Sequence, residues 1–215
     1  MKKIAILTFQ GFNEIDSLVA YRMLHWLQKP DWEITICSPE AEVTSMGGLS
    51  IRAHSALEDA SEADAVMIGS GSLTRQIVED ESIMSRIRLD PARQVIAAQC
   101  SGTLMAAKLG LLGGVPACTD SATKQWVLDA GVEVLNQPLV AHGNVATAGG
   151  CLGSAYLTGW TIAMLDSLDT ASTALHYFAP VGEKDGFLKR AQQNISPYLP
   201  ESAAGSLMRK PADVA

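Results

Sequence analysis

Short apolar segments alternate along the chain with longer segments in which apolar residues recur at helical spacing. Four of the short segments have the length and nearly continuous apolar character of buried strands: 3–9, 33–38, 65–69 and 94–99. Strands of this kind belong to parallel sheets whose two faces are both covered by helices. The pattern therefore predicts an α/β domain built on a mostly parallel sheet.

Helical spacing fills the intervals between these strands. The first helix is expected to begin after Asn13, whose side chain can cap it, and to stop at Pro30. The other expected helices cover 73–89 (one helix or a pair), 101–109, 123–130, 152–165 and 170–178. Two hairpins are also predicted over 42–53 and 139–150, with turns at Gly47-Gly48 and His142-Gly143-Asn144.

Residues 1–180 contain no linker and no internal repeat, and we assign them to one doubly wound domain. The segment 181–215 is rich in Pro, Gly, Ser and Lys, and we expect a loosely ordered C-terminal tail there. In doubly wound sheets, ligands bind at the carboxyl ends of the strands. Chemistry is therefore expected where the predicted strands end.

The composition and net charge of the chain indicate which kinds of partner the protein can bind. Hydrophobic residues make up 47% of the chain and charged residues 18%, as in a globular protein with a substantial core. The formal net charge is −7 and no basic cluster is present, which argues against nucleic acid and against anionic membranes as partners. No apolar run approaches the ~20 residues that span a bilayer, and no signal-peptide cleavage site follows the first strand. We therefore expect a cytoplasmic protein.

Four cysteines are scattered along the chain, at Cys37, Cys100, Cys118 and Cys151. They form no CxxC pair and have no histidine at metal-ligand spacing, so we predict no metal site and no other cofactor. In a reducing compartment they should be thiols rather than disulfides.

Cys100 ends the apolar segment 94–99, and a helix is predicted to begin immediately after it. A nucleophile at such a strand–turn–helix joint is exposed above the sheet, which is the geometry of a nucleophile elbow. Ala98 and Gly102 are small enough for the tight turn. The helix amino-terminus should favour a thiolate and lower the pKa of Cys100. The alternative is a buried cysteine that only packs.

A thiolate needs a proton partner, and Asp16 is the better candidate for it. Asp16 lies in the first turn of the first predicted helix, at the same edge of the sheet as Cys100. If its carboxyl reaches the sulfur, burial and proximity would raise its pKa and leave a neutral acid able to donate a proton. The alternative is that Asp16, like Glu14, only compensates the helix dipole. None of the four histidines adjoins Cys100 in the sequence, and His176 is left open as a partner.

Several segments together resemble the DJ-1/PfpI superfamily, over about residues 3 to 180. They are the strand-turn-acid segment FQGFNEIDSLVAYRML, the loop MIGSGSL, the elbow AAQCSGTLMAAKLGLLGG, the segment GNVATAGGCLGSAYLTGW and the late segment HYFAP. The pattern is most similar to the isocyanide hydratase branch, which is class I glutamine amidotransferase-like. That branch has an Asp in the first helix and Cys-Thr/Ser-Gly at the elbow.

The resemblance implies a flavodoxin-like three-layer sandwich with a cysteine nucleophile elbow, and a homodimer. It implies Cys100 as the nucleophile and Asp16 as its acid. The backbone N–H groups of Gly71 and Ser101 would stabilise developing negative charge. Substrate contacts are implied for Ser70, Gly102 and Trp126.

Three positions depart from patterns known in the superfamily. Where the loop usually reads Pro-Gly-Gly, residues 69–71 read Gly-Ser-Gly, which affects the shape of the loop. Where the branch has a His-Trp pair, residues 124–125 read Lys-Gln before Trp126. Protease-like members carry His after the nucleophile, so Ser101 argues against a PfpI-type peptidase.

The leading hypothesis is a cysteine-dependent enzyme that resembles isocyanide hydratase. The thiolate of Cys100 would attack the terminal carbon of an isocyanide, Asp16 would supply the proton, and water would release an N-formamide. One alternative is a non-enzymatic redox or stress sensor, or a DJ-1-like protein that binds a small ligand, in which Cys100 is oxidised. A second alternative is a glyoxalase-like lyase acting on 2-oxoaldehydes, a branch that normally uses Glu as the acid.

Overall fold

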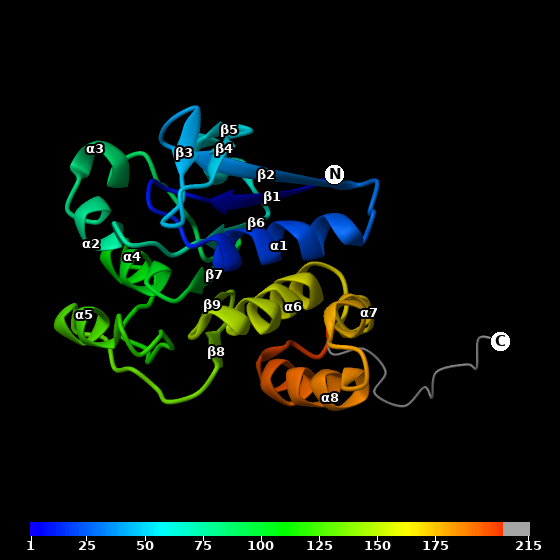
Figure 1. Cartoon of the computed structure of the whole chain (residues 1–215). Coiled ribbons are helices and arrows are strands. Elements are labelled where there is room, and N and C mark those ends of the chain that lie inside the picture. The colour runs from blue at the N-terminus through cyan, green and yellow to red at the C-terminus, as the bar shows by residue number, and fades with distance from the viewer. Residues whose placement is uncertain (204–215) are drawn as a thin grey trace.

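The computed structural model describes residues 1–203 and builds them around a seven-stranded sheet (Figure 1). The strand order is β5-β2-β1-β6-β7-β9-β8, and β8 alone runs antiparallel to its neighbour. The bounds are β1 Lys2–Leu7, β2 Trp32–Ser38, β5 Ser55–Ala56, β6 Ala65–Ile68, β7 Val95–Gln99, β8 Leu139–His142 and β9 Val145–Ala148. The mostly parallel sheet predicted from the apolar segments is confirmed.

Helices cover both faces of the sheet, so the domain has three layers (Figure 1). One face carries α1 Glu14–Trp26, α6 Ser154–Leu165, α7 Leu168–Phe178 and α8 Lys184–Ile195. The other carries the 3-10 helix η1 Leu57–Glu62 with α2 Thr74–Ile77, α3 Glu81–Met84, α4 Gly102–Lys108 and α5 Lys124–Asp129. Along β1, Ile4 and Ile6 join the first core while Ala5 and Leu7 join the second, as alternation along a strand requires.

The central strands are buried on both faces, which explains their continuous apolar character. All residues of β6 and β7 are buried, and β1 is buried from Ile4 to Leu7. The carboxyl ends of β1, β6 and β7 therefore lie side by side at one edge of the sheet.

Both predicted hairpins form. Strands β3 Glu42–Thr44 and β4 Ser50–Arg52 make a separate two-stranded antiparallel sheet, and β8 pairs with β9 at the edge of the large sheet. The segment expected to hold one helix or a pair holds two short helices, α2 and α3. Asn13 caps α1 as predicted, since its Oδ1 accepts from the Ile15 N–H at 3.0 Å.

The C-terminal segment differs from the loosely ordered tail expected for 181–215. Helix α8 and the 3-10 helix η3 Ser196–Tyr198 pack on the domain, and Ala191 and Ile195 are fully buried. The reason is a stripe of apolar residues at helical spacing, which the polar composition of the segment as a whole does not reveal. It consists of Phe187, Leu188, Ala191 and Ile195. Residues 204–215 lie outside the described residues.

No helix between residues 1 and 203 combines the length and apolar character needed to cross a membrane.

Candidate active site

Cys100 stands between β7 and α4 in a conformation that residues other than glycine rarely adopt. Its φ is 48°, and in the described chain Gln28 is the one other non-glycine residue with a positive φ. The Cys100 N–H donates to the Ala148 carbonyl at 2.8 Å, while its own carbonyl accepts from Thr103 N at 3.1 Å and Thr119 Oγ1 at 2.7 Å. Backbone strain persists where surrounding contacts over-determine it, and such residues cluster at functional sites.

Gly102 lets helix α4 begin against the neighbouring strand. A Cβ at this position would lie 2.6 Å from the Ile68 carbonyl oxygen and 2.8 Å from that of Gly69. Both are main-chain atoms at the end of β6, so a larger residue requires the backbone to move. The packing of the elbow therefore demands glycine two positions after the nucleophile.

Asp16 lies in the first turn of α1 and is 4% exposed. A carboxylate oxygen of Asp16 and the Sγ of Cys100 lie within 4.8 Å of one another. Ser70 Oγ donates to Asp16 Oδ2, and Ser154 Oγ donates to Oδ1 at 3.3 Å. The structure thus brings together Asp16, Cys100 and Ser70, three residues that the sequence singled out.

Burial governs the protonation of both groups. It raises the pKa of the Asp16 carboxyl above the ordinary value of 3.8, although hydrogen bonds led by that of Ser70 act in the opposite direction. Burial also raises the pKa of the Cys100 thiol, and the negative charges of Asp16 and Asp120 add to this. Two negative charges this close are unfavourable in a buried site, so Asp16 and Cys100, the acid–thiol pair, together hold at most one.

The lowered pKa expected for Cys100 from the helix amino-terminus is not what the structure favours. Helix α4 is seven residues long, and burial beside Asp16 outweighs its dipole at the sulfur. Protonation of Asp16 removes one cause of the raised Cys100 pKa, the charge of the carboxylate, whereas the burial of the sulfur remains.

The loop after β6 is tied to the elbow through the side chain of Ser101. The Gly71 N–H donates to Ser101 Oγ at 3.1 Å, and Thr74 Oγ1 lies 2.8 Å from the same oxygen. A Cβ on Gly71 would lie 2.5 Å from the Gly11 carbonyl oxygen, so only glycine fits the loop there. The Gly71 N–H is thus engaged, whereas the Ser101 N–H has no acceptor among residues 1–203.

Two further side chains surround the sulfur of Cys100. Gln99 is 2% exposed, and its Nε2 donates to Cys100 Sγ at 3.3 Å and to the Gly150 carbonyl at 2.9 Å. Its Oε1 is buried and has no donor within the described part of the chain. Cys151 opens the 3-10 helix η2 Cys151–Gly153, and its Sγ accepts from Asn13 Nδ2 at 3.3 Å.

Sequence reasoning missed Gln99 and Cys151 as neighbours of the nucleophile. Strand β9 pairs in parallel with β7, with Ala148 opposite Gln99, so the residues that follow β9 arrive beside Cys100. The glycines at 149–150 marked this edge of the sheet in the sequence, but the pairing of β7 with β9 has no local signal.

Asp16, Cys100 and Cys151 form the one cluster of three acidic, thiol or imidazole side chains within 4.8 Å among the described residues. Their donor atoms could hold a soft cation, yet hydrogen bonds from serine, glutamine and asparagine side chains already engage all three. No histidine belongs to the cluster. His176 lies on α7, where its Nε2 is 3.8 Å from the exposed Asp185 carboxylate.

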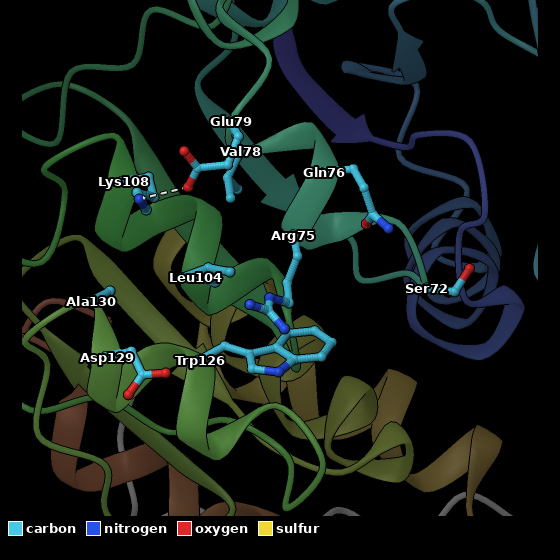
Figure 2. A pocket seen from close by; sticks show the side chains of 10 residues that line it. All are labelled: Ser72, Arg75, Gln76, Val78, Glu79, Leu104, Lys108, Trp126, Asp129 and Ala130. Carbon is cyan, nitrogen blue, oxygen red and sulfur yellow. Dashed lines mark hydrogen bonds and ion pairs between the residues drawn. The ribbon is translucent and has the colours of Figure 1, made fainter.

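Trp126 does not join this cluster. It lies on α5 and lines a pocket of about 780 Å³ together with side chains from the loop after β6 and from α2 and α4 (Figure 2). The Arg75 guanidinium lies 5.4 Å from the centre of the Trp126 ring, and Lys108 Nζ pairs with Glu79 at 2.9 Å (Figure 2). Neither member of the acid–thiol pair lines this pocket.

The chain is similar to a protein of known activity. It is 27% identical over 150 residues to the isonitrile hydratase of Pseudomonas putida, and the match covers 69% of this chain and 65% of that protein. The chain therefore spans slightly less than two thirds of the length of this relative.

Solved structures share the fold. A threonine-to-valine mutant of DJ-1 from Schizosaccharomyces pombe matches with a TM-score of 0.71 at 15% identity, covering 84% of this chain and 100% of that one. A cysteine-to-alanine mutant of a DJ-1 superfamily protein from Salmonella typhimurium matches with a TM-score of 0.69 at 22% identity, again covering 84% and 100%. Likeness at this level of identity concerns the fold alone. The DJ-1/PfpI family itself matches residues 2–159, which is most of the sequence, and the chain belongs to that family.

Proposed function

We propose that this protein hydrates an isocyanide to an N-formamide, with Cys100 as the nucleophile and Asp16 as the acid. The observation that carries the proposal is a buried carboxyl within 4.8 Å of a sulfur held at positive φ on a strand–helix turn. The similarity to an isonitrile hydratase supports the substrate class. An isocyanide suits such a pair because its terminal carbon accepts first a nucleophile and then a proton.

In the first step the Cys100 thiolate bonds to the terminal carbon, and protonated Asp16 delivers its proton to the same carbon. The product is a thioimidate, in which this carbon is bonded to sulfur, hydrogen and nitrogen. The negative charge passes from the sulfur to the Asp16 carboxylate. The raised pKa of Asp16 supports this role, since it makes the proton-donating form of the carboxyl more accessible.

In the second step water adds to the carbon, and one of its protons passes through Asp16 to the nitrogen. The carbon–sulfur bond then breaks, the hydroxyl proton returns to Asp16 and Cys100 leaves as the thiolate. The sum is one isocyanide plus one water giving one N-formamide, and the enzyme regains its starting state. Gln99 Oε1, the buried acceptor that lacks a donor in the described residues, is suited to hold this water beside the sulfur.

The remaining predicted residues support these steps in distinct ways. The Ser101 N–H donates to the negative charge that develops on the substrate, and the Gly71 N–H becomes a second donor when Ser101 Oγ releases it. Ser70 orients the Asp16 carboxyl, and Gly102 allows the close approach of α4. Trp126 contacts the substituent of the substrate from the pocket in Figure 2.

Turnover of a panel of alkyl and aryl isocyanides, followed as formamide by mass spectrometry, tests the proposal. We expect formamide from the wild type and from Cys118→Ala, a buried cysteine outside the site, but none above background from Cys100→Ala. Absence of formamide from the wild type, or equal rates in Cys100→Ala, would overturn it. Consumption of methylglyoxal without isocyanide turnover would instead identify the glyoxalase-like activity.

We also propose that two copies associate in the cytoplasm through the exposed face of α1 and the end of α7. Ile15 is 43% exposed and Tyr177 50%, and an apolar hollow of about 290 Å³ lies between α1 and Phe178. A reducing compartment keeps Cys100 as a thiol. Sedimentation equilibrium should give twice the chain mass for the wild type and the mass of one chain for Ile15→Asp.

A further inference from the structure

Two of the four cysteines lie close together although they are far apart in the sequence. The sulfur atoms of Cys100 and Cys151 lie within 4.8 Å of one another, at the ends of the paired strands β7 and β9. Cys100 is 3% exposed, whereas Cys151 is partly exposed. The same carboxylate, Asp16, lies within 4.8 Å of both sulfur atoms.

The other two cysteines provide an internal contrast. Cys37 Sγ lies 3.1 Å from Ser55 Oγ, and Cys118 is fully buried. Neither belongs to a cluster of ligand-type side chains in the described part of the molecule. Cys100 and Cys151 are therefore the two cysteines of the described chain that share a cluster of three such side chains.

We propose that Cys100 and Cys151 are a reversible redox pair that forms an intramolecular disulfide when the protein meets a hydroperoxide. This goes beyond the hydration reaction, which uses Cys100 and has no role for Cys151. The disulfide would make the nucleophile unavailable until a dithiol reduces it.

The oxidation begins at Cys151, because its sulfur is the more exposed of the two. The thiol takes one oxygen atom from the hydroperoxide and becomes a sulfenic acid, and the hydroperoxide leaves as an alcohol, or as water when it is hydrogen peroxide. The Cys100 sulfur then attacks the Cys151 sulfur and displaces the hydroxyl group. Asp16, which holds the proton of the acid–thiol pair while Cys100 is a thiolate, gives this proton to the leaving hydroxyl, which departs as water. Two thiols and one hydroperoxide thus give one disulfide, one alcohol and one water.

The local backbone allows the sulfur atoms to approach. A disulfide needs an S–S separation of about 2.05 Å, and the two sulfur atoms start within 4.8 Å of one another. Cys151 follows Gly149 and Gly150, and the space beside Gly150 is open, since no heavy atom lies within 4 Å of a Cβ built there. On the other side, Gln99 Nε2 already links the Cys100 sulfur to the Gly150 carbonyl, which keeps the two segments adjacent.

Intact mass and peptide mapping after stoichiometric hydrogen peroxide test this pair in the full-length protein. We expect the wild type and Cys118→Ser to lose the mass of two hydrogen atoms, to yield one linked peptide containing Cys100 and Cys151, and to recover after dithiothreitol. Cys151→Ser should not lose this mass, and its Cys100 should instead gain oxygen atoms that dithiothreitol does not fully remove.

Three outcomes would overturn the inference: a disulfide between chains on a non-reducing gel, a linkage that involves Cys37 or Cys118, or oxygen addition to the wild type without linkage. This mass measurement is independent of the substrate. A second readout rests on the proposed function: peroxide should abolish formamide production reversibly in the wild type and irreversibly in Cys151→Ser. Loss of hydration activity altogether would therefore leave the disulfide test intact.

Discussion

Two carboxylates in the first turn of α1 have opposite surroundings although one residue separates them. Glu14 reaches the turn between β3 and β4, residues 45–49, where its Oε1 accepts from Ser45 Oγ and from the Gly47 N–H at 3.0 Å. These donors lower its pKa. Asp16 points into the buried cluster beside Cys100, where burial raises its pKa. The position of a carboxyl on this helix turn therefore decides whether its pKa is lowered, as for Glu14, or raised, as for Asp16.

The largest effect is expected on turnover, from changing each carboxylate to its amide. Asp16→Asn removes the proton donor and should lower the rate of isocyanide hydration by roughly 100- to 10,000-fold. Glu14→Gln should leave the rate within about threefold of the wild type, because its carboxylate is engaged outside the site. Initial rates of both variants at saturating substrate measure this. Equal losses in the two variants would remove the distinction between the carboxylates.

The second effect compares two glycines: Gly102, two residues after Cys100 at the elbow, and Gly48, in the turn between β3 and β4. Gly102→Ala sets a Cβ against two main-chain oxygens and should lower the free energy of unfolding by roughly 2–3 kcal/mol. Gly48 lies in the exposed turn at φ 89° with open space around it, so Gly48→Ala should cost about 1–2 kcal/mol, from backbone strain alone. Urea titrations of both variants compare them. A smaller loss for Gly102→Ala would mean that β6 and α4 can separate easily.

The third effect is a difference in the sign of the pH dependence of stability. The folded-state pKa of Asp16 is raised, so its contribution is fully present below 3.8 and is lost as the pH rises through the folded value. The folded-state pKa of Glu14 is lowered, so its contribution is present above 4.5 and is lost as the pH falls. Relative to the wild type, Asp16→Asn should gain stability with rising pH, by about 1.4 kcal/mol for each tenfold change in the dissociation constant.

Over the same range Glu14→Gln should lose stability relative to the wild type as the pH rises. Urea midpoints between pH 3 and pH 8 for the two variants and the wild type provide the measurement. If the stabilities of both variants relative to the wild type changed in the same direction with pH, the buried surroundings of Asp16 and the hydrogen-bonded surroundings of Glu14 would be contradicted.

Much of the fold could be predicted because its information is local. The buried strands are continuous apolar runs, and Asn13 marks the start of the first helix, which ends at Trp26, before the stop predicted at Pro30. The elbow could be predicted because Ala98 and Gly102 flank Cys100, and Asp16 because it follows the end of a strand at the same edge. Each of these inferences needs a few neighbouring residues and the rule that parallel strands end together.

The rest depends on contacts that no short segment specifies. Cys151 meets Cys100 because β9 pairs with β7, and the same pairing brings the Gly150 carbonyl to Gln99 Nε2, which also donates to the Cys100 sulfur. The raised pKa of Cys100 could not be anticipated from its helix, since it depends on the burial of the sulfur and on the nearby charge of Asp16. Helix α8 could not be predicted from composition because its segment is rich in polar residues, although Ile195 on this helix belongs to the hydrophobic core.

The smallest effect should come from the exposed turn itself. Ser45 donates to Glu14 and accepts from the N–H groups of Gly47 at 3.2 Å and Leu49 at 2.9 Å. Ser45→Ala should therefore lower the free energy of unfolding by about 1 kcal/mol and leave hydration unchanged. A thermal melt of Ser45→Ala measures the loss of stability, and one assay of isocyanide hydration checks that the activity is unchanged. A marked loss of activity would connect the turn to the site.

The order of the strands also determines when the residues of the candidate site come together during folding. The strands β1, β6, β7 and β9 are consecutive neighbours in the sheet, and the segments after them carry Asp16, Ser70, Cys100 and Cys151 in turn. Every one of these pairings joins strands that are distant along the chain, and such pairings form slowly. A partly folded chain has the cysteine but not its acid. The acid–thiol pair is therefore complete only when β1, β6 and β7 have paired, so the proposed hydration requires the finished sheet.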